Sequence, residues 1–349
     1  MPLAAAETAL LEERRPITRR EALGVAHLPL DSLPDLISLA HRVRMAWRGP
    51  EVELEGLLNA KSGACAEDCA FCSQSAHFPA STVEAYPFLQ LDRIRAAAKQ
   101  TLDAGATQFC IVVAIRGPDQ AMIDKVVEAT NSVIEDTGLE VACSLGLLQP
   151  GQAEQLAAAG IKRYNHNLEA PRSRFDQVCT THTYDDRVET CNRAVQAGME
   201  LCSGGILGMG ESLEERVEFA FELRELDPCE VPINFLDPRP GTPLADAMRL
   251  PAREALQAIA LFRLILPGSW LRLAGGREKI LGELQSMGMY AGANALIVGD
   301  YLTTSGRSAE QDHLMLDSLG MPVATGPGEG RFIVDSRGGQ SLPARAPGS

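Results

Sequence analysis

Short apolar runs alternate with longer amphipathic stretches from about residue 52 to residue 298. Eight of the apolar runs are predicted to be strands, at 52–59, 108–115, 139–145, 163–168, 200–206, 231–236, 270–274 and 294–298. Between the strands, apolar residues recur three and four positions apart, which is typical of helices that bury one face. These helices are predicted at 91–104, 122–136, 153–159, 185–197, 213–226, 252–265 and 278–287. Such an alternation predicts an α/β fold with a parallel sheet covered by helices.

Three of the helix-to-strand junctions share the same Ala-Gly pair. Ala104-Gly105, Ala159-Gly160 and Ala197-Gly198 each place a glycine where a helix stops, and this position favours the left-handed backbone that glycine adopts easily. Eight regular units favour a closed (β/α)8 TIM-type barrel over an open doubly wound sheet, because a barrel leaves no edge strand unpaired. Functional residues of such a barrel gather at the C-terminal ends of its strands.

The two ends of the chain differ from its middle. Residues 1–50 are predicted to form an N-terminal helical extension in which Pro34 opens a helix, and residues 51–320 the barrel. Residues 321–349 are predicted to be a loose C-terminal tail, since they are rich in glycine, proline and serine. The first 30 residues lack an uninterrupted apolar core and carry charges of both signs, so they resemble neither a secretory signal nor a transit peptide.

The composition narrows the class of partner. Of the 349 residues, 45% are hydrophobic and 22% are charged, as in an ordinary globular protein. A net charge of −14 argues against nucleic acid or an anionic membrane surface and favours a small molecule. No segment reaches the roughly 18 apolar residues that a membrane span needs. Nine cysteines without an export signal indicate the cytoplasm and metal binding rather than disulfides.

Cys65, Cys69 and Cys72 form a C-x3-C-x2-C run just after the first predicted strand. Thiolates are the usual ligands of iron–sulfur clusters, and this spacing can direct all three at one [4Fe–4S] cubane. The fourth iron would then lack a protein ligand and could bind a small molecule. A structural zinc site with His77 or a distant cysteine, and chance clustering of buried thiols, are the alternatives.

Three further cysteines lie inside predicted strands. Cys110, Cys143 and Cys202 fall in the second, third and fifth strands. Because alternate strand residues point into a barrel, the three thiols could converge on a second metal site, although each could equally be a small core residue. The remaining cysteines fall in a loop, a helix and a turn and are interpreted as structural: Cys179, Cys191 and Cys229.

Polar residues within strands suggest a ligand. Arg272 lies on the seventh predicted strand and needs an anionic partner there, which could be a carboxylate or the substrate. Asn167 and Asn234, at the fourth and sixth strands, could bind a urea-like or amide-like group or be satisfied within the core. His166 could donate a hydrogen bond or act as a base. The glycines of residues 204–210 permit, without proving, close approach of backbone to a ligand.

The chain resembles the biotin synthase family of radical S-adenosylmethionine enzymes over roughly residues 30–320. The matching motifs lie, in order, at 62–75, 164–168, 202–205, 231–234, 241–244, 276–278 and 302–304. The resemblance implies a closed barrel, usually a homodimer, that acts as a sulfurtransferase and converts dethiobiotin to biotin in the last step of biotin biosynthesis. It implies reductive cleavage of S-adenosylmethionine to a 5′-deoxyadenosyl radical, so the cofactors and no side chain perform the catalysis.

The resemblance also implies roles for individual residues. A [4Fe–4S] cluster is expected on Cys65, Cys69 and Cys72, and a [2Fe–2S] cluster on Cys110, Cys143, Cys202 and Arg272. S-adenosylmethionine is expected to contact Phe71 and Ile206 with its adenine, Asn167 and Glu169 with its ribose, and Arg187 with its carboxylate. Dethiobiotin is expected to place its ureido ring at Asn167 and Asn234 and its carboxylate at Thr303 and Thr304. Glu169 departs from the family pattern, where a shorter acid or its amide is expected.

The implied partners are an electron donor such as flavodoxin or ferredoxin, and iron–sulfur assembly proteins. Two other functions stay open. Another radical S-adenosylmethionine barrel, such as a mutase or lyase, would share the cysteine loop but would not need all four residues of the second site. An iron–sulfur carrier would have no use for a pocket containing Asn234, Thr303 and Thr304.

Overall fold

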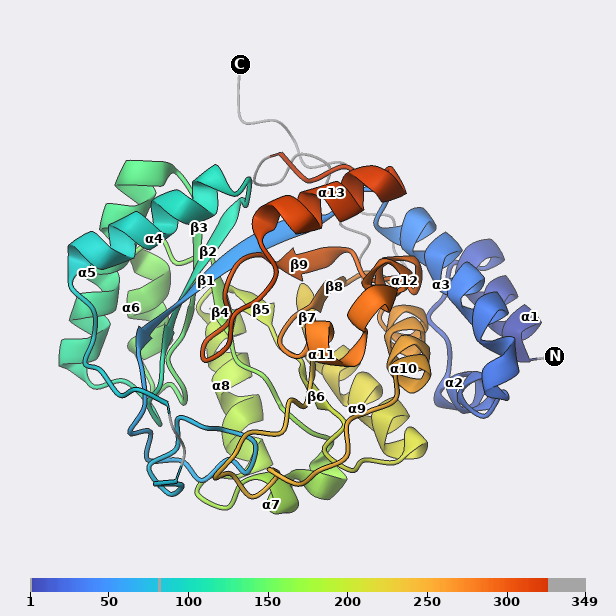
Figure 1. The fold of residues 1–349 in the computed structure, drawn as a ribbon, viewed down its shortest axis with the longest axis horizontal. Coiled ribbons are helices and arrows are strands. Elements are labelled where there is room, and N and C mark those ends of the chain that lie inside the picture. The colour runs from blue at the N-terminus through green and yellow to red at the C-terminus, as the bar shows by residue number, and fades with distance from the viewer. Residues whose placement is uncertain (1, 81–82, 326–349) are drawn as a thin grey trace.

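The computed structural model describes residues 2–80 and 83–325. Its centre is one parallel sheet (Figure 1). The strands are β1 (Glu53–Lys61), β2 (Gln108–Val113), β3 (Glu140–Ser144), β4 (Arg163–Asn165), β5 (Glu200–Cys202), β6 (Gly205–Leu207), β7 (Glu230–Phe235), β8 (Trp270–Leu273) and β9 (Ala295–Ile297). They lie in the order β5-β4-β3-β2-β1-β9-β8-β7-β6.

A single bridge closes this sheet into a barrel. Cys202 of β5 pairs with Glu230 of β7, so the sheet has no free edge between them. β5 and β6 together replace the predicted strand 200–206, with Ser203 and Gly204 between them. A Cβ atom on Gly204 would lie 2.1 Å from the carbonyl oxygen of Pro232 in β7, so only glycine allows this close approach. The predicted (β/α)8 barrel is confirmed, with β5 and β6 as one of its eight units.

Helices surround the barrel (Figure 1). They are α4 (Leu91–Asp103), α5 (Gln120–Thr137), α6 (Gln152–Ala158), α7 (Phe175–Val178), α8 (Tyr184–Gln196), α9 (Leu213–Leu226), α10 (Ala252–Ile265), α11 (Arg277–Ile280), α12 (Gln285–Tyr290) and α13 (Ala309–Leu319). Capping boxes at Thr183, Ser212 and Ser308 begin α8, α9 and α13. The predicted helix 278–287 is wrong as one element, because η4 (Gly282–Leu284) separates α11 from α12.

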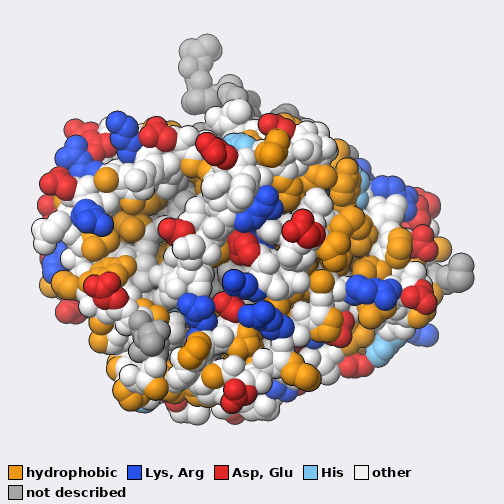
Figure 2. Space-filling view, in the orientation of Figure 1, with side chains coloured by type: hydrophobic (Ala, Val, Ile, Leu, Met, Phe, Trp, Pro, Cys, Tyr) orange, Lys and Arg blue, Asp and Glu red, His pale blue; other side chains and the backbone are white. Residues whose placement is uncertain are grey.

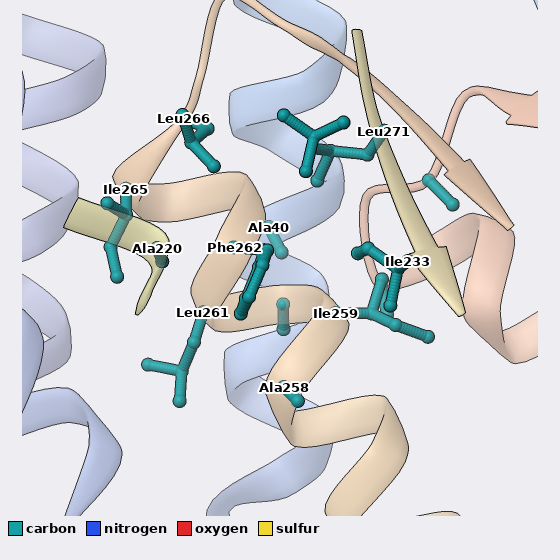
Figure 3. Packing of buried hydrophobic residues seen from close by; sticks show 14 of the residues in the cluster. Ala40, Ala220, Ile233, Ala258, Ile259, Leu261, Phe262, Ile265, Leu266 and Leu271 are labelled. Carbon is teal, nitrogen blue, oxygen red and sulfur yellow. The ribbon is translucent and has the colours of Figure 1, made fainter. Parts of the chain in front are cut away.

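The N-terminal residues form a helical layer against one side of the barrel. This layer consists of α1 (Pro2–Glu7), η1 (Thr8–Glu12), α2 (Arg19–Ala26), η2 (Leu30–Ser32) and α3 (Leu33–Trp47), and Pro34 lies in the first turn of α3. The core between this layer and the barrel is apolar. In Figure 3, Phe262 and Ile259 of α10 lie among Ala40 of α3 and Ile233 and Leu271 of the barrel strands.

The C-terminal segment begins later than predicted. The amide of Val52 donates to the carbonyl of Pro322 at 2.8 Å, and the amide of Ala324 donates to the carbonyl of Val52 at 2.9 Å. Residues 321–324 therefore pack on the start of β1, and the remainder of the predicted loose tail, 326–349, lies outside the described residues. Across residues 2–80 and 83–325, no helix is long and apolar enough to span a membrane.

Candidate functional site

A cavity of about 420 Å³ lies within the barrel and among the loops that follow its strands. Every residue predicted to bind a cluster, S-adenosylmethionine or dethiobiotin lines this cavity, with the exception of Cys143. The residues come from the cysteine loop after β1, the ends of β4 to β9 and the interior of the barrel. The fold thus brings chemically distinct groups together around one cavity.

The cysteine loop folds on its own backbone. The amide of Cys65 donates to the carbonyl of Gln74 at 3.0 Å, and the amide of Cys72 donates to that of Cys69 at 2.9 Å. The side-chain oxygen of Gln74 accepts hydrogen bonds from Asn59 at 3.0 Å and from the amide of Gly63 at 3.2 Å. These bonds hold the loop against β1 and direct three thiols at the cavity.

The surroundings of the three thiols shift their pKa upward. Burial raises the pKa of Cys65 and raises the pKa of Cys72 to about 11. A hydrogen bond with Cys179, whose Sγ lies 3.8 Å away, raises the pKa of Cys69 and lowers that of Cys179 to about 4. A positive metal centre would release these protons, so binding of a cluster is coupled to proton loss. The sequence predicts a structural role for Cys179, because nothing in it indicates the contact with Cys69.

Arg187 is held by a chain of side chains that reaches back to the cysteine loop. Its Nε donates to Nε2 of His182 at 2.8 Å, and its Nη1 donates to the carbonyl of Asn167 at 2.8 Å. Because Nε2 of His182 accepts, Nδ1 carries the hydrogen and donates it to Glu67. Burial raises the pKa of Glu67, but hydrogen bonds from Thr181 and His182 lower it more, so this pKa lies below its usual value.

Sequence reasoning missed Glu67 and His182. Glu67 lies between two cysteines of the loop, and His182 lies five residues before Arg187. This closeness to expected binding residues is the signal by which the sequence could have indicated them. The ligand atoms of Glu67, Cys179 and His182 lie within 4.8 Å of one another. An ion on Nδ1 of His182 would put the proton on Nε2, where Arg187 already donates, so the geometry favours a hydrogen-bonded set over a metal.

Phe71 and Ile206 share an apolar cluster that forms one wall of the cavity. Next to it, Glu169 adopts a φ of 69°, a left-handed backbone that is unusual for this residue type. Its carbonyl accepts a hydrogen bond from the amide of Ile206 at 2.9 Å, and its carboxylate accepts one from Asn167 at 3.3 Å. Burial raises the pKa of Glu169.

Asn234 and the loop after β9 line another part of the cavity. The amide of Asn234 donates to the carbonyl of Gly205 at 3.2 Å, and its oxygen accepts from the backbone amide of Gly275 at 3.0 Å. Thr303 and Thr304 lie in the loop, and Arg239 donates to the carbonyl of Thr303 at 3.2 Å. Arg239 is a cationic residue that the sequence analysis did not single out.

Below these groups, the interior of the barrel holds a buried ionic network. Arg272 donates from Nε and Nη2 to the two oxygens of Glu230, each at 2.5 Å, and from Nη1 to the carbonyl of Leu296 at 2.9 Å. Arg163 binds Glu53 at 3.0 Å and Glu230 at 2.5 Å. Burial lowers the pKa of Arg272, but Glu230 and the neighbouring carboxylates outweigh burial and raise it overall.

Cys110 and Cys202 face this network. The side-chain amide of Asn165 donates to the Sγ atom of Cys110 at 3.3 Å, and the thiol of Cys202 donates to Glu230 at 3.3 Å. Burial raises the pKa of both thiols well above the usual range, and the carboxylates of Glu55 and Glu230 raise it further. Two of the three predicted thiols therefore share one set of charged neighbours.

Cys143 does not line the cavity with these two cysteines. On β3, Ala142 is paired with Cys110 and Arg163, whose side chains face the interior. Cys143 is paired with Ile111 and Tyr164, and it packs with them in the apolar layer between the barrel and its helices. Successive strand residues point to opposite faces, so Cys143 points away from the cavity.

Two family models match the chain. The model described as "Radical SAM superfamily" matches residues 60–223, and the one described as "Biotin and Thiamin Synthesis associated domain" matches residues 232–322. Together they include every residue that is predicted to bind a cluster, S-adenosylmethionine or dethiobiotin.

The chain is similar over most of its length to proteins of known activity. It is 52% identical over 322 residues to a biotin synthase of Mycolicibacterium paratuberculosis, which covers 92% of this chain and 93% of the relative. It is also 52% identical to a biotin synthase of Rhodococcus jostii, over 92% of this chain and 95% of the relative.

Solved structures share the fold at low identity. Methylornithine synthase has a TM-score of 0.78 at 20% identity, over 91% of this chain and 97% of that one. HydG, a maturase of the [FeFe]-hydrogenase, has a TM-score of 0.81 at 15% identity, over 96% of this chain and 79% of that one. These likenesses support the barrel and carry no argument about the substrate.

Proposed function

Because the chain belongs to the biotin synthase family of radical S-adenosylmethionine enzymes, it is a sulfurtransferase that converts dethiobiotin to biotin, and we propose here which of its residues do so. Enzymes of this family use S-adenosylmethionine, a [4Fe–4S] cluster and a [2Fe–2S] cluster, and they need an electron donor. The observation that carries the residue assignment is the single cavity on which fourteen of the fifteen expected binding residues converge.

Cys65, Cys69 and Cys72 fit a [4Fe–4S] cluster. All three thiols line the cavity from one loop, and a bound cluster would take the place of their protons. When bound, this cluster supplies the electron for reductive cleavage of S-adenosylmethionine. The loop itself supplies the three thiolates and leaves the side toward Arg187 and Glu169 for the ligand.

Arg187 binds the carboxylate of S-adenosylmethionine. Its Nη2 lies 3.9 Å from the Sγ atom of Cys69, so a carboxylate bound there would also be beside the cluster. His182 and Glu67 hold the guanidinium in this position. Phe71 and Ile206 form the apolar surface for the adenine, and Asn167 and Glu169 present hydrogen-bonding groups to the ribose.

Asn167 and Asn234 bind the ureido ring of dethiobiotin. The oxygen and the amide of Asn234 each make one backbone hydrogen bond, which fixes the orientation of the side chain and leaves a second lone pair and a second hydrogen for the ring. Thr303 and Thr304 receive the carboxylate tail, and the guanidinium of Arg239 beside Thr303 adds a positive charge there.

The second cluster fits the interior in part. Cys110, Cys202 and Arg272 line the cavity together, whereas Cys143 lies on the other face of β3. Nη1 of Arg272 donates to the carbonyl of Leu296, and because a protonated guanidinium has no lone pair, Arg272 would have to lose a proton to act as a ligand. Cys110, Cys143, Cys202 and Arg272 are proposed as its ligands, of which Cys143 would have to turn inward from β3.

The remaining partners and the domain limits stay proposals. Flavodoxin or ferredoxin is the proposed electron donor, iron–sulfur assembly proteins are the proposed suppliers of the clusters, and a homodimer is the proposed assembly.

Acidic and basic side chains are interspersed on the face shown in Figure 2, in agreement with a small-molecule partner rather than a nucleic acid. The cytoplasm is the proposed location, since electron donors of this kind are found there. Residues 1–50 and 51–320 are proposed as helical extension and barrel.

Anaerobic reconstitution with iron and sulfide tests the proposal. The reconstituted chain is expected to form 5′-deoxyadenosine and biotin when dethiobiotin, S-adenosylmethionine and a reductant are added. Cys65→Ala, Cys69→Ala and Cys72→Ala should each abolish 5′-deoxyadenosine, and Cys229→Ala, outside the cavity lining, serves as the matched control. Normal formation of 5′-deoxyadenosine by all three variants would contradict the assignment of the first cluster.

A further inference from the structure

We propose that Asn59 is a positioning residue for dethiobiotin. Its side chain joins the cysteine loop to the loop of residues 301–304, and it thereby sets the direction of a backbone amide that meets the substrate carboxylate. The inference rests on the proposed function, which places that carboxylate at Thr303 and Thr304. Asn59 is outside the residues that were expected to bind a ligand.

The backbone of β1 fixes the place of Asn59. The pairing of β1 with β2 shifts between Asn59 and Lys61, which marks a β-bulge, and bulges often direct a side chain at a functional site. The hydroxyl of Tyr86 donates to the backbone carbonyl of Asn59 at 2.7 Å. Because these contacts involve only the backbone of Asn59, we expect that its side chain can be replaced without displacing the strand.

The side chain of Asn59 donates to two loops at once. Asn59 is 6% exposed, and its Nδ2 atom donates to Oε1 of Gln74 at 3.0 Å and to the carbonyl of Leu302 at 3.0 Å. Oε1 of Gln74 also accepts from the backbone amide of Gly63, which fixes the orientation of Gln74. Both partners of Asn59 are acceptors, so Nδ2 must lie between them, although Oδ1 of Asn59 has no partner among the described residues. Both hydrogens of the amide are thus used to join the loops.

The hydrogen bond to Leu302 sets the direction of the next amide. In a trans peptide, the N–H group points opposite to the C=O group of the same unit, and no peptide among the described residues is cis. The carbonyl of Leu302 points to Asn59, so the amide of Thr303 points away from it. The carbonyl of Thr303 points to Arg239, so the amide of Thr304 points away from that side chain. Neither amide has an acceptor among the described residues, and successive amides of this kind can bind an anion.

Asn59 is the more firmly held of the two supports. The side chain of Arg239 is 33% exposed and also forms an ion pair with Asp237 at 3.2 Å. Asn59 is buried, so water competes less for its hydrogen bonds. Without its side chain, the carbonyl of Leu302 would lose its donor and could turn, and the amide of Thr303 would turn with it.

Equilibrium titration of the reconstituted holoenzyme, saturated with S-adenosylmethionine, tests the proposal. Asn59→Leu has a similar size but no donor, and we expect the Kd for dethiobiotin to rise about tenfold. The methyl ester of dethiobiotin lacks the charged carboxylate, so its Kd should change by less than about twofold. A general loosening of the site would weaken both ligands equally. Asn131→Leu, on the exposed face of α5, is the matched control and should change neither Kd.

Gln74→Leu breaks the same connection from the cysteine loop. If the connection acts as a unit, the double variant should lose little more dethiobiotin affinity than Asn59→Leu alone. The visible absorption of the first cluster and the affinity for S-adenosylmethionine report that each variant is folded and loaded. Should Asn59→Leu fail to take up the clusters, Gln74→Leu must show the same selective loss of affinity for the acid.

Three results would overturn the proposal: unchanged dethiobiotin affinity in Asn59→Leu, equal weakening for the acid and the ester, or additive losses in the double variant. The parent protein separates these failures from a failure of the proposed function. Equal affinity of the parent for the acid and the ester would contradict the proposed carboxylate site itself, and the inference with it.

Discussion

A hydrogen bond to a histidine fixes the direction of Arg187. The guanidinium donates to Nε2 of His182, whose other nitrogen donates to Glu67 in the cysteine loop. Arg187, the proposed anchor for S-adenosylmethionine, and the proposed loop for the first cluster are therefore joined by hydrogen bonds. Glu67 and His182 were not among the residues expected to bind a ligand, and we predict that they act through Arg187.

Removing the side chain of His182 should weaken S-adenosylmethionine binding. His182→Ala leaves Nε of Arg187 without its acceptor, and we expect the Kd for S-adenosylmethionine to rise about tenfold, which corresponds to about 1.4 kcal/mol. Equilibrium binding to the cluster-loaded protein measures this. His182→Gln, whose amide oxygen can accept the same bond, should restore most of the affinity, and His27→Ala on the surface should have no effect. Unchanged affinity in His182→Ala would contradict a positioning role.

Asn234 should matter to the other ligand. Asn234→Ala removes groups that face the proposed ureido ring, so we expect dethiobiotin binding to weaken by about 1–3 kcal/mol. The affinity for S-adenosylmethionine should change less. Isothermal titration of both ligands gives the comparison, with Asn131→Ala on the exposed face of α5 as control. Equal dethiobiotin affinity in variant and parent would move the ring to another part of the cavity.

At the scale of the element, the fold was largely predictable from the sequence. The strand periodicity and the Ala-Gly helix stops depend on local chemistry that one sequence carries. The break between β5 and β6 was not predicted, because it is caused by the close approach of Pro232 from a distant strand. The division of 278–287 into α11, η4 and α12 is also absent from the local pattern.

The face of Cys143 shows the limit of the sequence for the site. The alternation of side chains along a strand tells which of its residues share a face. Which of the two faces points into the barrel depends on how the strand pairs with its neighbours, and this register is a tertiary property. One signal was present: Val141, Cys143 and Leu145 alternate with Glu140, Ala142 and Ser144, so the apolar set belongs to one face. Polar partners such as Glu67 for His182 could not be paired, because more than a hundred residues separate them.

The glycine between β5 and β6 gives a test of this close approach. Gly204→Ala would bring a methyl group to 2.1 Å from the carbonyl oxygen of Pro232, and we expect a loss of about 1–3 kcal/mol or more in the free energy of unfolding. Gly24→Ala, within α2, is the matched control, since the nearest atom to its new methyl group is Cβ of Pro2 in α1, 3.6 Å away. That change should stabilise the helix by up to about 1 kcal/mol. Urea unfolding measures both, and equal midpoints would contradict the clash.

At the scale of the whole molecule, the N-terminal helices and the barrel share one core. Arg224 of α9 donates to the carbonyl of Ile17, and Gln257 of α10 donates to that of Ala26. Leu10 is fully buried in the same apolar cluster as the inner helices. The layer is thus bound to the barrel by both apolar packing and buried hydrogen bonds, and the two should unfold together.

Leu10→Ala tests this coupling. The lost apolar contact and the resulting cavity should cost about 2–5 kcal/mol. Because the core is shared, urea unfolding should remain a single transition with a lower midpoint, whereas Leu314→Ala on the exposed side of α13 should change stability by less than about 0.5 kcal/mol. Two separate transitions in Leu10→Ala would mean that the helical layer is an independent unit.

The buried ionic network closes one end of the barrel. Glu53, Arg163, Glu200 and Glu230 are each the first residue of their strand, so the network blocks the N-terminal end. Both ligands then have to enter at the end with the cysteine loop, where Asn234 and the residues proposed for S-adenosylmethionine line one cavity. We therefore expect dethiobiotin to enter first and S-adenosylmethionine to close the passage above it. Stopped-flow mixing should show slower dethiobiotin association when the protein is first saturated with S-adenosylmethionine, and equal rates in both orders would mean that a second opening exists.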